Sequence, residues 1–326
     1  MKICIYGAGA IGGFLGARLG VSGHAMSAVA RGATLAALNE HGLRLELDGV
    51  VVRSPVQASA NARDLRSQDL VIVAVKGPAM AAVAAGIAPL LHDQTMVLVA
   101  MNGVPWWFFT GMPGPLENAR LDTLDPAGTI AAAIPAHHVI GSVVHASCTM
   151  SVPGLARHVV GRGIIVGEPA GGTSPRVEHL ARLLTDAGFE SRVTSRIQQD
   201  IWYKLWGNMT MNPVSALTGA TSDRVLDDPL VLAYIDAMMG EAATVGNAIG
   251  CPIAQSPADR HAITRKLGAF RTSMLQDVDA GRALEIDALV TAVREIALKV
   301  KVATPNIDAL LGLTRLFART RGLYPG

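Results

Sequence analysis

The segment "KICIYGAGAIGGFLGARLG", residues 2–20, decides the fold of the first half of the chain. It joins a short apolar segment, 2–6, to a glycine-rich turn and then to a segment of helical character. Gly7, Gly9 and Gly12 match the pattern G-x-G-x-x-G in the context that gives this pattern meaning, after a strand and at the start of a helix. We therefore predict the first strand, turn and helix of a β-α-β unit.

The glycine turn has the chemistry of a diphosphate site. The first glycine permits a tight turn, the second lets a diphosphate approach the backbone, and the third lets the helix lie close to the strand. The helix N-terminus adds free N–H groups and a positive potential. A purely structural turn is the alternative. The residues predicted to contact a dinucleotide here are Gly7, Ala8, Gly9, Ala10, Ile11 and Gly12.

The second strand is expected at residues 25–31, "AMSAVAR". A domain that selects NAD usually ends this strand with Asp or Glu, whose carboxylate bonds the ribose 2′-hydroxyl. Here no acid is present, and Arg31 stands in that place. A guanidinium suits a 2′-phosphate by charge and by its fork of donors, so the sequence favours NADPH/NADP+ as the cofactor. A solvent-exposed arginine at a strand end is the alternative.

Two later segments, 69–76 ("DLVIVAVK") and 95–102 ("TMVLVAMN"), predict buried parallel strands separated by a helix. Lys76 and Asn102 fall at the carboxyl ends of these strands, where open parallel sheets bind ligands. We expect both residues to contact the cofactor or the substrate. A solvent-exposed lysine and a turn-forming Asn-Gly pair are the alternatives.

The segments around these strands are less regular. Residues 43–47 and 50–54 predict a hairpin, and strand character returns at 139–147 and 163–169. Between them, residues 103–115, "GVPWWFFTGMPGP", fit no regular element. Their four consecutive aromatic residues either pack under a loop, which we favour, or form a hydrophobic lid over a pocket.

Composition excludes several classes of protein. With 326 residues, 50% of them hydrophobic and only 17% charged, the chain has the composition of a compact two-domain protein. A net charge of +2 and the absence of a basic run give no reason to expect a nucleic-acid partner. Widely spaced cysteines at 4, 148 and 251 suggest neither a disulfide framework nor a zinc site, and we predict no metal.

The apolar segments indicate no membrane partner. None of them is long enough to cross a bilayer without interruption, and the chain opens directly into a strand and a glycine turn. A cytoplasmic location is therefore expected.

From residue 197 the pattern is almost wholly helical. The predicted fold class is α/β: a Rossmann-type, doubly wound sheet over residues 1–196, followed by an all-helical domain over 197–326. One helix is expected to run from 256 to 281, with Gly281 as its C-cap. We expect the active site in the cleft between the two domains.

One helix of this half carries an unusual polar stripe. In "IWYKLWGNMTMNP", residues 201–213, Lys204, Asn208 and Asn212 are spaced by four. Each step of four residues turns a helix by only about 40°, so the three side chains share one face. The stripe is either the solvated side of a surface helix or a functional face.

Four phrases together resemble the ketopantoate reductase (2-dehydropantoate 2-reductase) family: "GAGAIGG" at 7–13, "KLWGNMTMNP" at 204–213, "TSMLQD" at 272–277 and "EID" at 285–287. They follow the family's order across nearly the whole chain. The resemblance implies a two-domain, NADPH-dependent reductase. Such an enzyme would reduce the 2-oxo acid ketopantoate to pantoate, a step of pantothenate biosynthesis.

The resemblance also implies individual roles. Lys204 matches the family's catalytic lysine, and Glu285 matches the glutamate that contacts the cofactor at the active site. Asn102 matches an asparagine that touches both ligands, and Ala146 lies where a cofactor contact is expected. The remaining matches are the substrate-binding residues Asn208, Asn212 and Ser273.

The chemistry of ketone reduction suits this set. Hydride arrival leaves negative charge on the carbonyl oxygen, which a nearby ammonium stabilises and protonates. Lys204 fits this role if its surroundings lower its pKa. Asn208 and Asn212 can hold the substrate's hydroxyl and carboxylate, and Ser273 can add a bond to the carboxylate. Glu285 can orient the ribose or nicotinamide and pair with Lys204.

Departures from the family pattern leave the substrate open. Met101 stands where glutamine is common in the family, and no further substrate asparagine after Asn212 has a clear match. The alternatives are a reductase of another small 2-oxo acid and a non-catalytic dinucleotide-binding sensor. A small 2-oxo acid is the one partner predicted, and a homodimer stays open.

Overall fold

The computed structural model describes residues 1–325, which divide into two compact units. The first comprises Met1–Met101 and Ala127–Ile197, and the second comprises Asn102–Pro126 and the chain from Gln198 onward. The later division lies close to the expected boundary, but the segment 102–126 groups with the helical unit instead of the sheet. Its aromatic side chains explain this difference, because the ring of Phe108 lies 6.1 Å from the ring of Trp202 in the second unit.

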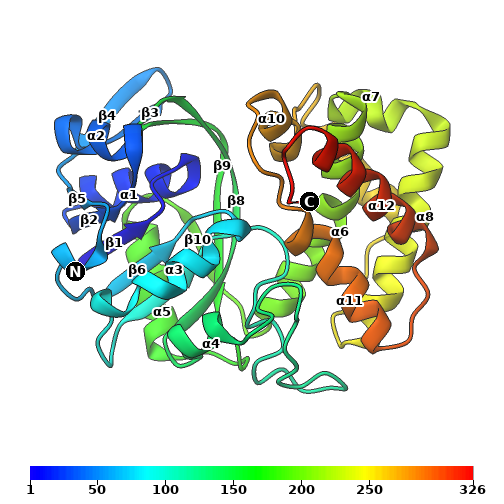
Figure 1. The fold of residues 1–326 in the computed structure, drawn as a ribbon, viewed down its shortest axis with the longest axis horizontal. Coiled ribbons are helices and arrows are strands. Elements are labelled where there is room, and N and C mark those ends of the chain that lie inside the picture. Colours follow the sequence, from blue (N-terminus) through cyan, green and yellow to red (C-terminus); the bar gives the residue numbers. More distant parts are fainter. Residues whose placement is uncertain (326) are drawn as a thin grey trace. The chain divides into compact units, whose positions relative to one another are not determined.

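A single mixed sheet organises the first unit (Figure 1). Its strands are β1 (Lys2–Tyr6), β2 (Ala25–Val29), β3 (Leu43–Leu47), β4 (Val50–Ser54), β5 (Gln57–Ser59), β6 (Leu70–Val73), β7 (Met96–Val99), β8 (Val139–Val152), β9 (Leu155–Gly167) and β10 (Glu190–Val193). Their order is β4-β3-β9-β8-β7-β6-β1-β2-β5, with β10 paired to β9.

The parallel part of this sheet is doubly wound, as predicted. From β1 the chain moves outward to β2 and β5, then returns to the other side of β1 and continues through β6, β7 and β8, all in parallel. The direction of winding therefore changes between β1 and β6. In open α/β sheets, ligands bind at this switch point, beside the carboxyl ends of the strands.

Local sequence patterns locate most strands well. The predicted hairpin is formed by β3 and β4, which pair antiparallel with Leu47 opposite Val50. Its turn residues, Asp48 and Gly49, have φ angles of 51° and 78°, which suit a two-residue hairpin. Strand β2 ends at Val29, two residues earlier than expected.

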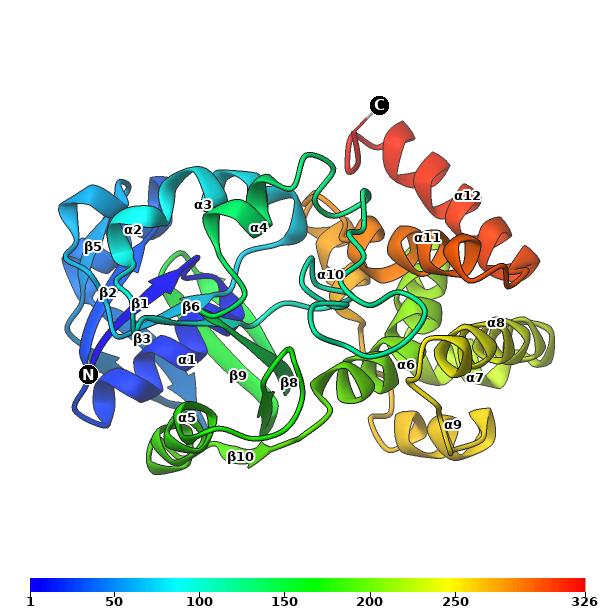
Figure 2. The same cartoon turned by 90° about the horizontal axis from the view of Figure 1, so that it is seen from below.

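Helices cover both faces of the sheet, with α1 and α5 on one face and α3 and α4 on the other (Figure 2). The helices of this unit are α1 (Ala10–Val21), α2 (Gly32–His41), α3 (Met80–Gly86), α4 (Thr129–Ala133) and α5 (Pro175–Asp186). Helix α1 is mostly buried, and its Phe14 and Leu15 pack with Ile3 and Ile5 of β1 in the core of the unit. This packing fixes the start of α1 above the end of β1.

The second unit is helical. Its helices are α6 (Ile197–Thr218), α7 (Ser222–Asp227), α8 (Pro229–Ala248), α9 (Pro257–Arg265), α10 (Ser273–Asp279), α11 (Ala292–Lys299) and α12 (Pro305–Thr320), with a π-helix at Asp287–Thr291. The single helix predicted over 256–281 is wrong, because α9 and α10 are separate. Gly268 is left-handed between them, and the side chain of Thr272 caps α10 by accepting from the Leu275 N–H.

Two buried tryptophans fix the rotation of α6. Trp202 Nε1 donates to the Ala242 carbonyl at 3.2 Å, and Trp206 Nε1 donates to the Met239 carbonyl at 2.8 Å. Both acceptors belong to α8. Lys204 stands between these tryptophans in sequence, and two residues turn a helix by about 200°, so its side chain leaves the helix on the opposite side.

The aromatic run at 106–109 is ordinary core packing, as favoured from the sequence. All four side chains are buried, and the rings of Phe108 and Phe109 meet edge to face at 5.0 Å. The alternative of an exposed hydrophobic lid does not fit this burial.

Candidate active site

Close backbone contacts shape the glycine turn. Gly7 has a φ of +98°, and a Cβ at this position would lie 2.6 Å from Cγ1 of Val75. A Cβ on Gly12 would lie 2.1 Å from the carbonyl oxygen of Gly7. Neither position has room for a side chain, which agrees with the tight turn and the close helix–strand approach predicted from the sequence.

Gly9 differs from both, because no described atom lies within 4 Å of the position its Cβ would occupy. The folded chain itself therefore gives no steric reason for glycine here. Gly9 is also the N-cap of α1, and within residues 1–325 no side chain caps this helix and no acid stands in its first turn. The positive end of α1 is thus open to an anion, so the turn fits the diphosphate of a dinucleotide.

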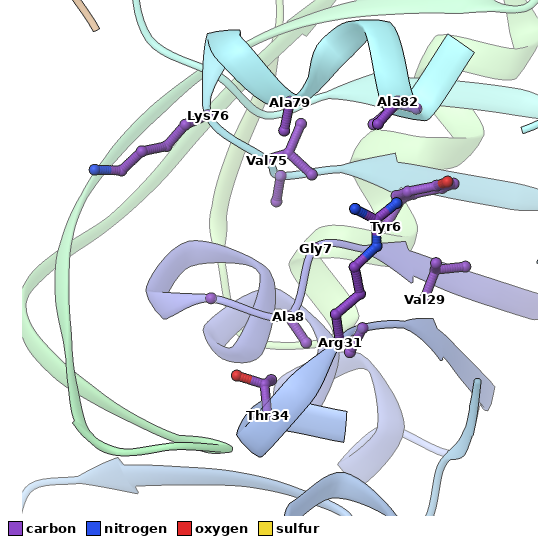
Figure 3. A pocket seen from close by; sticks show the side chains of 14 residues that line it. Tyr6, Gly7, Ala8, Val29, Arg31, Thr34, Val75, Lys76, Ala79 and Ala82 are labelled. Atoms are coloured by element: carbon purple, nitrogen blue, oxygen red, sulfur yellow. The ribbon is translucent and has the colours of Figure 1, made fainter. Parts of the chain in front are cut away.

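A cavity of about 330 Å³ lies beside this turn, at the switch point between β1 and β6 (Figure 3). It is lined by the ends of β1 and β2, the start of α2, and the segment that leads from β6 into α3. The predicted cofactor residues that line it are Gly7, Ala8, Gly9, Arg31 and Lys76. Residues from three separate segments of the first unit therefore meet at one cavity.

Arg31 is the N-cap of α2, and its side chain extends toward Tyr6 (Figure 3). Burial raises the pKa of Tyr6, while the positive charge of Arg31 acts in the opposite direction. The Arg31 guanidinium is therefore close enough to the cavity to act on the pKa of Tyr6, which lines it, although Arg31 itself is exposed. No Asp or Glu is among the described residues that line this cavity.

A second polar cluster lies in the helical unit. The Lys204 ammonium donates to Oδ1 of Asn102 at 2.8 Å, although 102 positions separate them in sequence. The next residue, Gly103, has a φ of +83°, and its Cβ would lie 2.4 Å from the Ala288 carbonyl oxygen. Because Val104 also donates its N–H to that carbonyl at 2.8 Å, the turn that carries Asn102 is fixed in place.

The carbonyl of Ala288 belongs to the π-helix Asp287–Thr291, which starts two residues after Glu285. Single π turns inside helical segments are frequent at functional sites. Glu285 is half-buried and lies near enough to Lys204 for its charge to raise the lysine pKa. Lys204, Asn102 and Glu285 thus form one electrostatic group.

The environment of Lys204 lowers its pKa from 10.5 to about 8. Burial of the amine is the largest cause, because the charged form loses hydration. The carboxylate of Glu285 opposes this shift, and the positive charge of Arg260 adds to it. An amine with a pKa near 8 is mostly protonated at neutral pH and can still release its proton, which suits a general acid.

The polar stripe of α6 continues away from Lys204. Asn208 is half-buried one turn further on, and Asn212 is buried one turn beyond it. Asn212 Nδ2 donates to Oγ of Ser273, the first residue of α10, at 3.5 Å. Lys204 is therefore grouped with Asn102 and Glu285, and Asn212 with Ser273. Together with Asn208, six of the predicted residues lie in the second unit.

Some predicted cofactor residues lie outside the cavity lining. Ala10, Ile11 and Gly12 form the first turn of α1, behind the residues that line it. Ala146 lies on β8, where the pairing with β9 shifts register between His145 and Ser147. Asn102 and Glu285 belong to the cluster of the second unit. Cofactor contacts of these residues stay predictions.

Three polar or charged residues at these sites were not among those predicted from the sequence. Tyr6 and Thr34 line the cavity, and Arg260 acts on Lys204 from α9. The position of Tyr6 in the sequence could have identified it, because Tyr6 ends β1 directly before Gly7. Arg260 had none in its own neighbourhood, because only the tertiary fold brings it to α6.

The described residues contain neither a candidate metal site nor a candidate membrane span. No group of three or more His, Cys, Asp or Glu side chains in residues 1–325 is arranged to hold a metal ion. None of the helices in that range combines the length and apolar character needed to cross a bilayer.

Family models describe both halves of the chain. Residues 3–171 match ketopantoate reductase PanE/ApbA, and residues 196–318 match the C-terminal domain of ketopantoate reductase PanE/ApbA. The 2-dehydropantoate 2-reductase of Mesorhizobium japonicum is 46% identical over 325 residues, which cover 99% of this chain and 100% of that protein.

Solved structures agree with this match. A crystal structure from Ralstonia solanacearum MolK2, provisionally named a ketopantoate reductase, is 60% identical and covers 99% of both chains with a TM-score of 0.95. The 2-dehydropantoate 2-reductase of Geobacter metallireducens GS-15 is 25% identical, covers 97% of this chain and 100% of its own, and has a TM-score of 0.85.

Proposed function

This chain belongs to the ketopantoate reductase PanE/ApbA family, and on that premise we propose that it reduces ketopantoate (2-dehydropantoate) to pantoate with NADPH. The reaction places the chain in pantothenate biosynthesis. The observation that carries the proposal is the half-buried Lys204 amine, which is bonded to Asn102, lies near Glu285 and has a pKa of about 8.

The cavity of the first unit supports a dinucleotide cofactor. Its glycine turn and the open N-terminus of α1 would hold the diphosphate. Arg31 lines the same cavity, and the absence of an acid among its described lining residues favours NADPH over NADH. Lys76 would add a second positive charge near the phosphates. NADPH, when bound, supplies the hydride that reduces the ketone carbon.

Lys204 is the proton donor in this proposal. Its ammonium stabilises the negative charge that grows on the ketone oxygen and transfers a proton from Nζ to that oxygen. Asn102 accepts a hydrogen bond from the same amine and thereby fixes its direction. Glu285 keeps part of the amine population protonated by raising the lysine pKa against the effect of burial.

The remaining polar residues of the stripe hold the substrate. Asn208, Asn212 and Ser273 offer amide and hydroxyl groups along one side of α6 and the start of α10. These groups can bond the terminal hydroxyl of ketopantoate. A non-catalytic sensor would have no use for a lysine whose pKa is held near 8, so the polar cluster favours an enzyme.

The test is the consumption of NADPH, followed at 340 nm, with ketopantoate beside pyruvate, 2-oxoisovalerate and other branched 2-oxo acids. We expect ketopantoate to give the highest kcat/KM. A higher value for another 2-oxo acid would replace the substrate and leave the reaction type standing. No oxidation of NADPH with any of these acids would overturn the proposal in favour of a sensor.

The cytoplasmic location and the homodimer remain predictions. Fractionation of the native host, with immunodetection of this chain, tests the location. Light scattering after size-exclusion chromatography tests the assembly, and a mass near the 34.0 kDa of one chain would exclude a stable dimer.

A further inference from the structure

Arg260, on α9, has a polar atom that the fold leaves unsatisfied. Its Nε is buried and has no hydrogen-bond partner in the described part of the chain. The guanidinium carbon lies 5.4 Å from the ring centre of Tyr203, on the face of α6. A buried donor without a partner costs about 1–3 kcal/mol, so a native protein rarely keeps one without a reason.

Gly207 makes the space for this guanidinium. A Cβ at position 207 would lie 2.7 Å from Nε and 2.9 Å from Nη2 of Arg260. Glycine inside a helix is less stable than alanine by about 0.5–1 kcal/mol, so its use in the middle of α6 needs an explanation. Close approach of Arg260 to the helix provides one.

The guanidinium lies beside the polar cluster. Around α6, Tyr203 and Gly207 fall on one side of Lys204, whereas Asn208 and Asn212 fall on the other side. Arg260 is close enough to Lys204 for its positive charge to lower the lysine pKa. The Arg260 guanidinium, the Lys204 ammonium and the amides of Asn208 and Asn212 therefore follow one another in this order around α6.

Two acids close to α9, one beside Arg260 in sequence and one on α8, have other partners. Asp259 accepts from the backbone and the hydroxyl of Ser256 in the capping box of α9. Asp236 pairs with His261 at 2.6 Å. Neither acid therefore accounts for the position of the Arg260 guanidinium.

We propose that Arg260 binds the carboxylate of the 2-oxo acid and sets the position of the adjacent ketone at Lys204. This inference rests on the proposed function and adds a substrate-binding residue to it. In ketopantoate the carboxylate, the ketone and the terminal hydroxyl follow one another along the molecule. The row of Arg260, Lys204, and Asn208 with Asn212 offers a cation, a proton donor and neutral amides in the same order.

Charge balance gives a second reason for this assignment. The site already contains the carboxylate of Glu285, and Lys204 gives up its proton during the reaction. A substrate carboxylate therefore needs a cation that stays charged throughout, and arginine is effectively always protonated. Two parallel N–H bonds from its fork also fix the plane of a carboxylate, which a lysine cannot do.

Steady-state kinetics of Arg260→Gln test the proposal. We expect KM for ketopantoate to rise about 10–100-fold, because a charge-assisted hydrogen bond contributes about 1.5–3 kcal/mol. The KM for NADPH should stay unchanged.

Arg260→Lys keeps the charge and loses the fork of donors, so its KM for ketopantoate should rise by less, about 3–10-fold. Lys266→Gln, which removes one exposed positive charge from the end of the same helix, is the matched control and should behave as the wild type.

A neutral ligand separates substrate binding from a structural role, and a pH profile checks the charge of Arg260 at Lys204. The neutral lactone of ketopantoate, followed as a substrate or as a competitive inhibitor, should bind equally to the wild type and to Arg260→Gln. The falling limb of the kcat–pH profile should move to higher pH in Arg260→Gln, because Lys204 then faces the carboxylate of Glu285 without a neighbouring cation. A purely structural arginine would weaken both ligands, and the limb would move in either case because it reports the charge of Arg260 at Lys204.

Gly207→Ala offers an independent probe that leaves Arg260 in the chain. Its methyl group should displace the guanidinium and raise KM for ketopantoate by roughly 3–10-fold, with no loss of helix stability. In the Arg260→Gln background the same change should have no further effect on KM, since neighbouring sites that act through one group are not additive.

The outcomes are distinct. The role of Arg260 is overturned if Arg260→Gln has the wild-type KM for ketopantoate. It is also overturned if Arg260→Gln weakens the binding of ketopantoate and of its lactone equally. Either result leaves the reductase function standing. Failure of the wild type to reduce any 2-oxo acid overturns both. A preference for another 2-oxo acid keeps the proposal, and the same variants are then measured with that acid.

Discussion

The cavity of the first unit and the polar cluster of the second are built from different parts of the chain. Backbone dominates at the cavity: Gly7 and Gly12 exclude side chains, and the end of α1 supplies N–H groups. Side chains dominate at the cluster, where Lys204 bonds to Asn102 and is influenced by Glu285 and Arg260. Substitutions at the cavity should therefore act through the shape of the glycine turn, and substitutions at the polar cluster should act through charge.

This difference predicts how kinetic effects divide. A change at the cavity should alter KM for NADPH and, where it meets protein atoms, the free energy of unfolding. A change at Lys204 or Arg260 should alter kcat or KM for the 2-oxo acid and leave NADPH binding intact. Four experiments test or refine this contrast.

The largest effect is expected for Lys204→Met. Removal of a positioned general acid should lower kcat by about 10²–10⁴-fold. The KM for NADPH should not change, because the cavity lies in the first unit. Steady-state kinetics and cofactor fluorescence titration measure the two quantities, with the exposed Lys266→Met as control. Normal turnover by Lys204→Met would exclude Lys204 as the proton donor.

Arg31→Ala should give the next largest effect. Loss of a charge-assisted contact to the 2′-phosphate should raise KM for NADPH by about 10–100-fold, with little change for NADH. Arg66→Ala removes an exposed arginine elsewhere on the same unit and serves as the control. If the wild type already used NADH and NADPH equally well, the assigned cofactor preference would be wrong.

Two alanine substitutions in the glycine turn should separate cofactor contact from protein packing. Gly12→Ala should lower the free energy of unfolding by about 1–3 kcal/mol, because its Cβ would lie 2.1 Å from the Gly7 carbonyl oxygen. Gly9→Ala meets no described atom beyond its chain neighbours, so only its poorer capping of α1 should count, and the free energy of unfolding should fall by no more than about 1 kcal/mol.

Cofactor binding should nevertheless weaken in Gly9→Ala. Its methyl group would occupy the approach of the diphosphate, and we expect KM for NADPH to rise about tenfold or more, equal to about 1.4 kcal/mol. Chemical denaturation measures the free energy of unfolding of both variants, and NADPH titration measures their affinity for the cofactor. Unchanged NADPH affinity in Gly9→Ala would show that the diphosphate does not lie against this turn.

The smallest effect concerns pH. Lys204 has a pKa of about 8 in the folded protein. In the proposed mechanism it donates its proton in the reductive direction, so the protonated form would be the active one. With saturating substrates, kcat for reduction should fall about tenfold between pH 7 and pH 9, whereas kcat for pantoate oxidation should rise over the same range. A profile that stays flat from pH 6 to pH 10 would contradict this assignment.

Several features of the molecule could be predicted from contiguous sequence. The glycine pattern after β1 predicted the fold class and the glycine turn, and the spacing of Lys204, Asn208 and Asn212 predicted a shared helix face. The failed prediction of one helix over 256–281 has a local cause as well. Helical periodicity continued past Gly268, and the cap formed by Thr272 was overlooked.

Other features depended on contacts between distant segments. Asn102 and Lys204 are 102 positions apart, and the π-helix carbonyl that fixes the Asn102 turn comes from a third segment. Arg260 reaches α6 from a helix with no motif of its own. The mid-helix Gly207 was the one local sign that another segment approaches there, but it does not identify that segment.

The sequence by itself therefore determined which backbone turns form and which side chains share a helix face, because these depend on residues next to one another or one turn apart. The tertiary structure alone decided the pKa of Lys204, the residues that line the cavity and the place of Arg260. Burial and charge proximity are set by packing between segments that the chain order does not bring together.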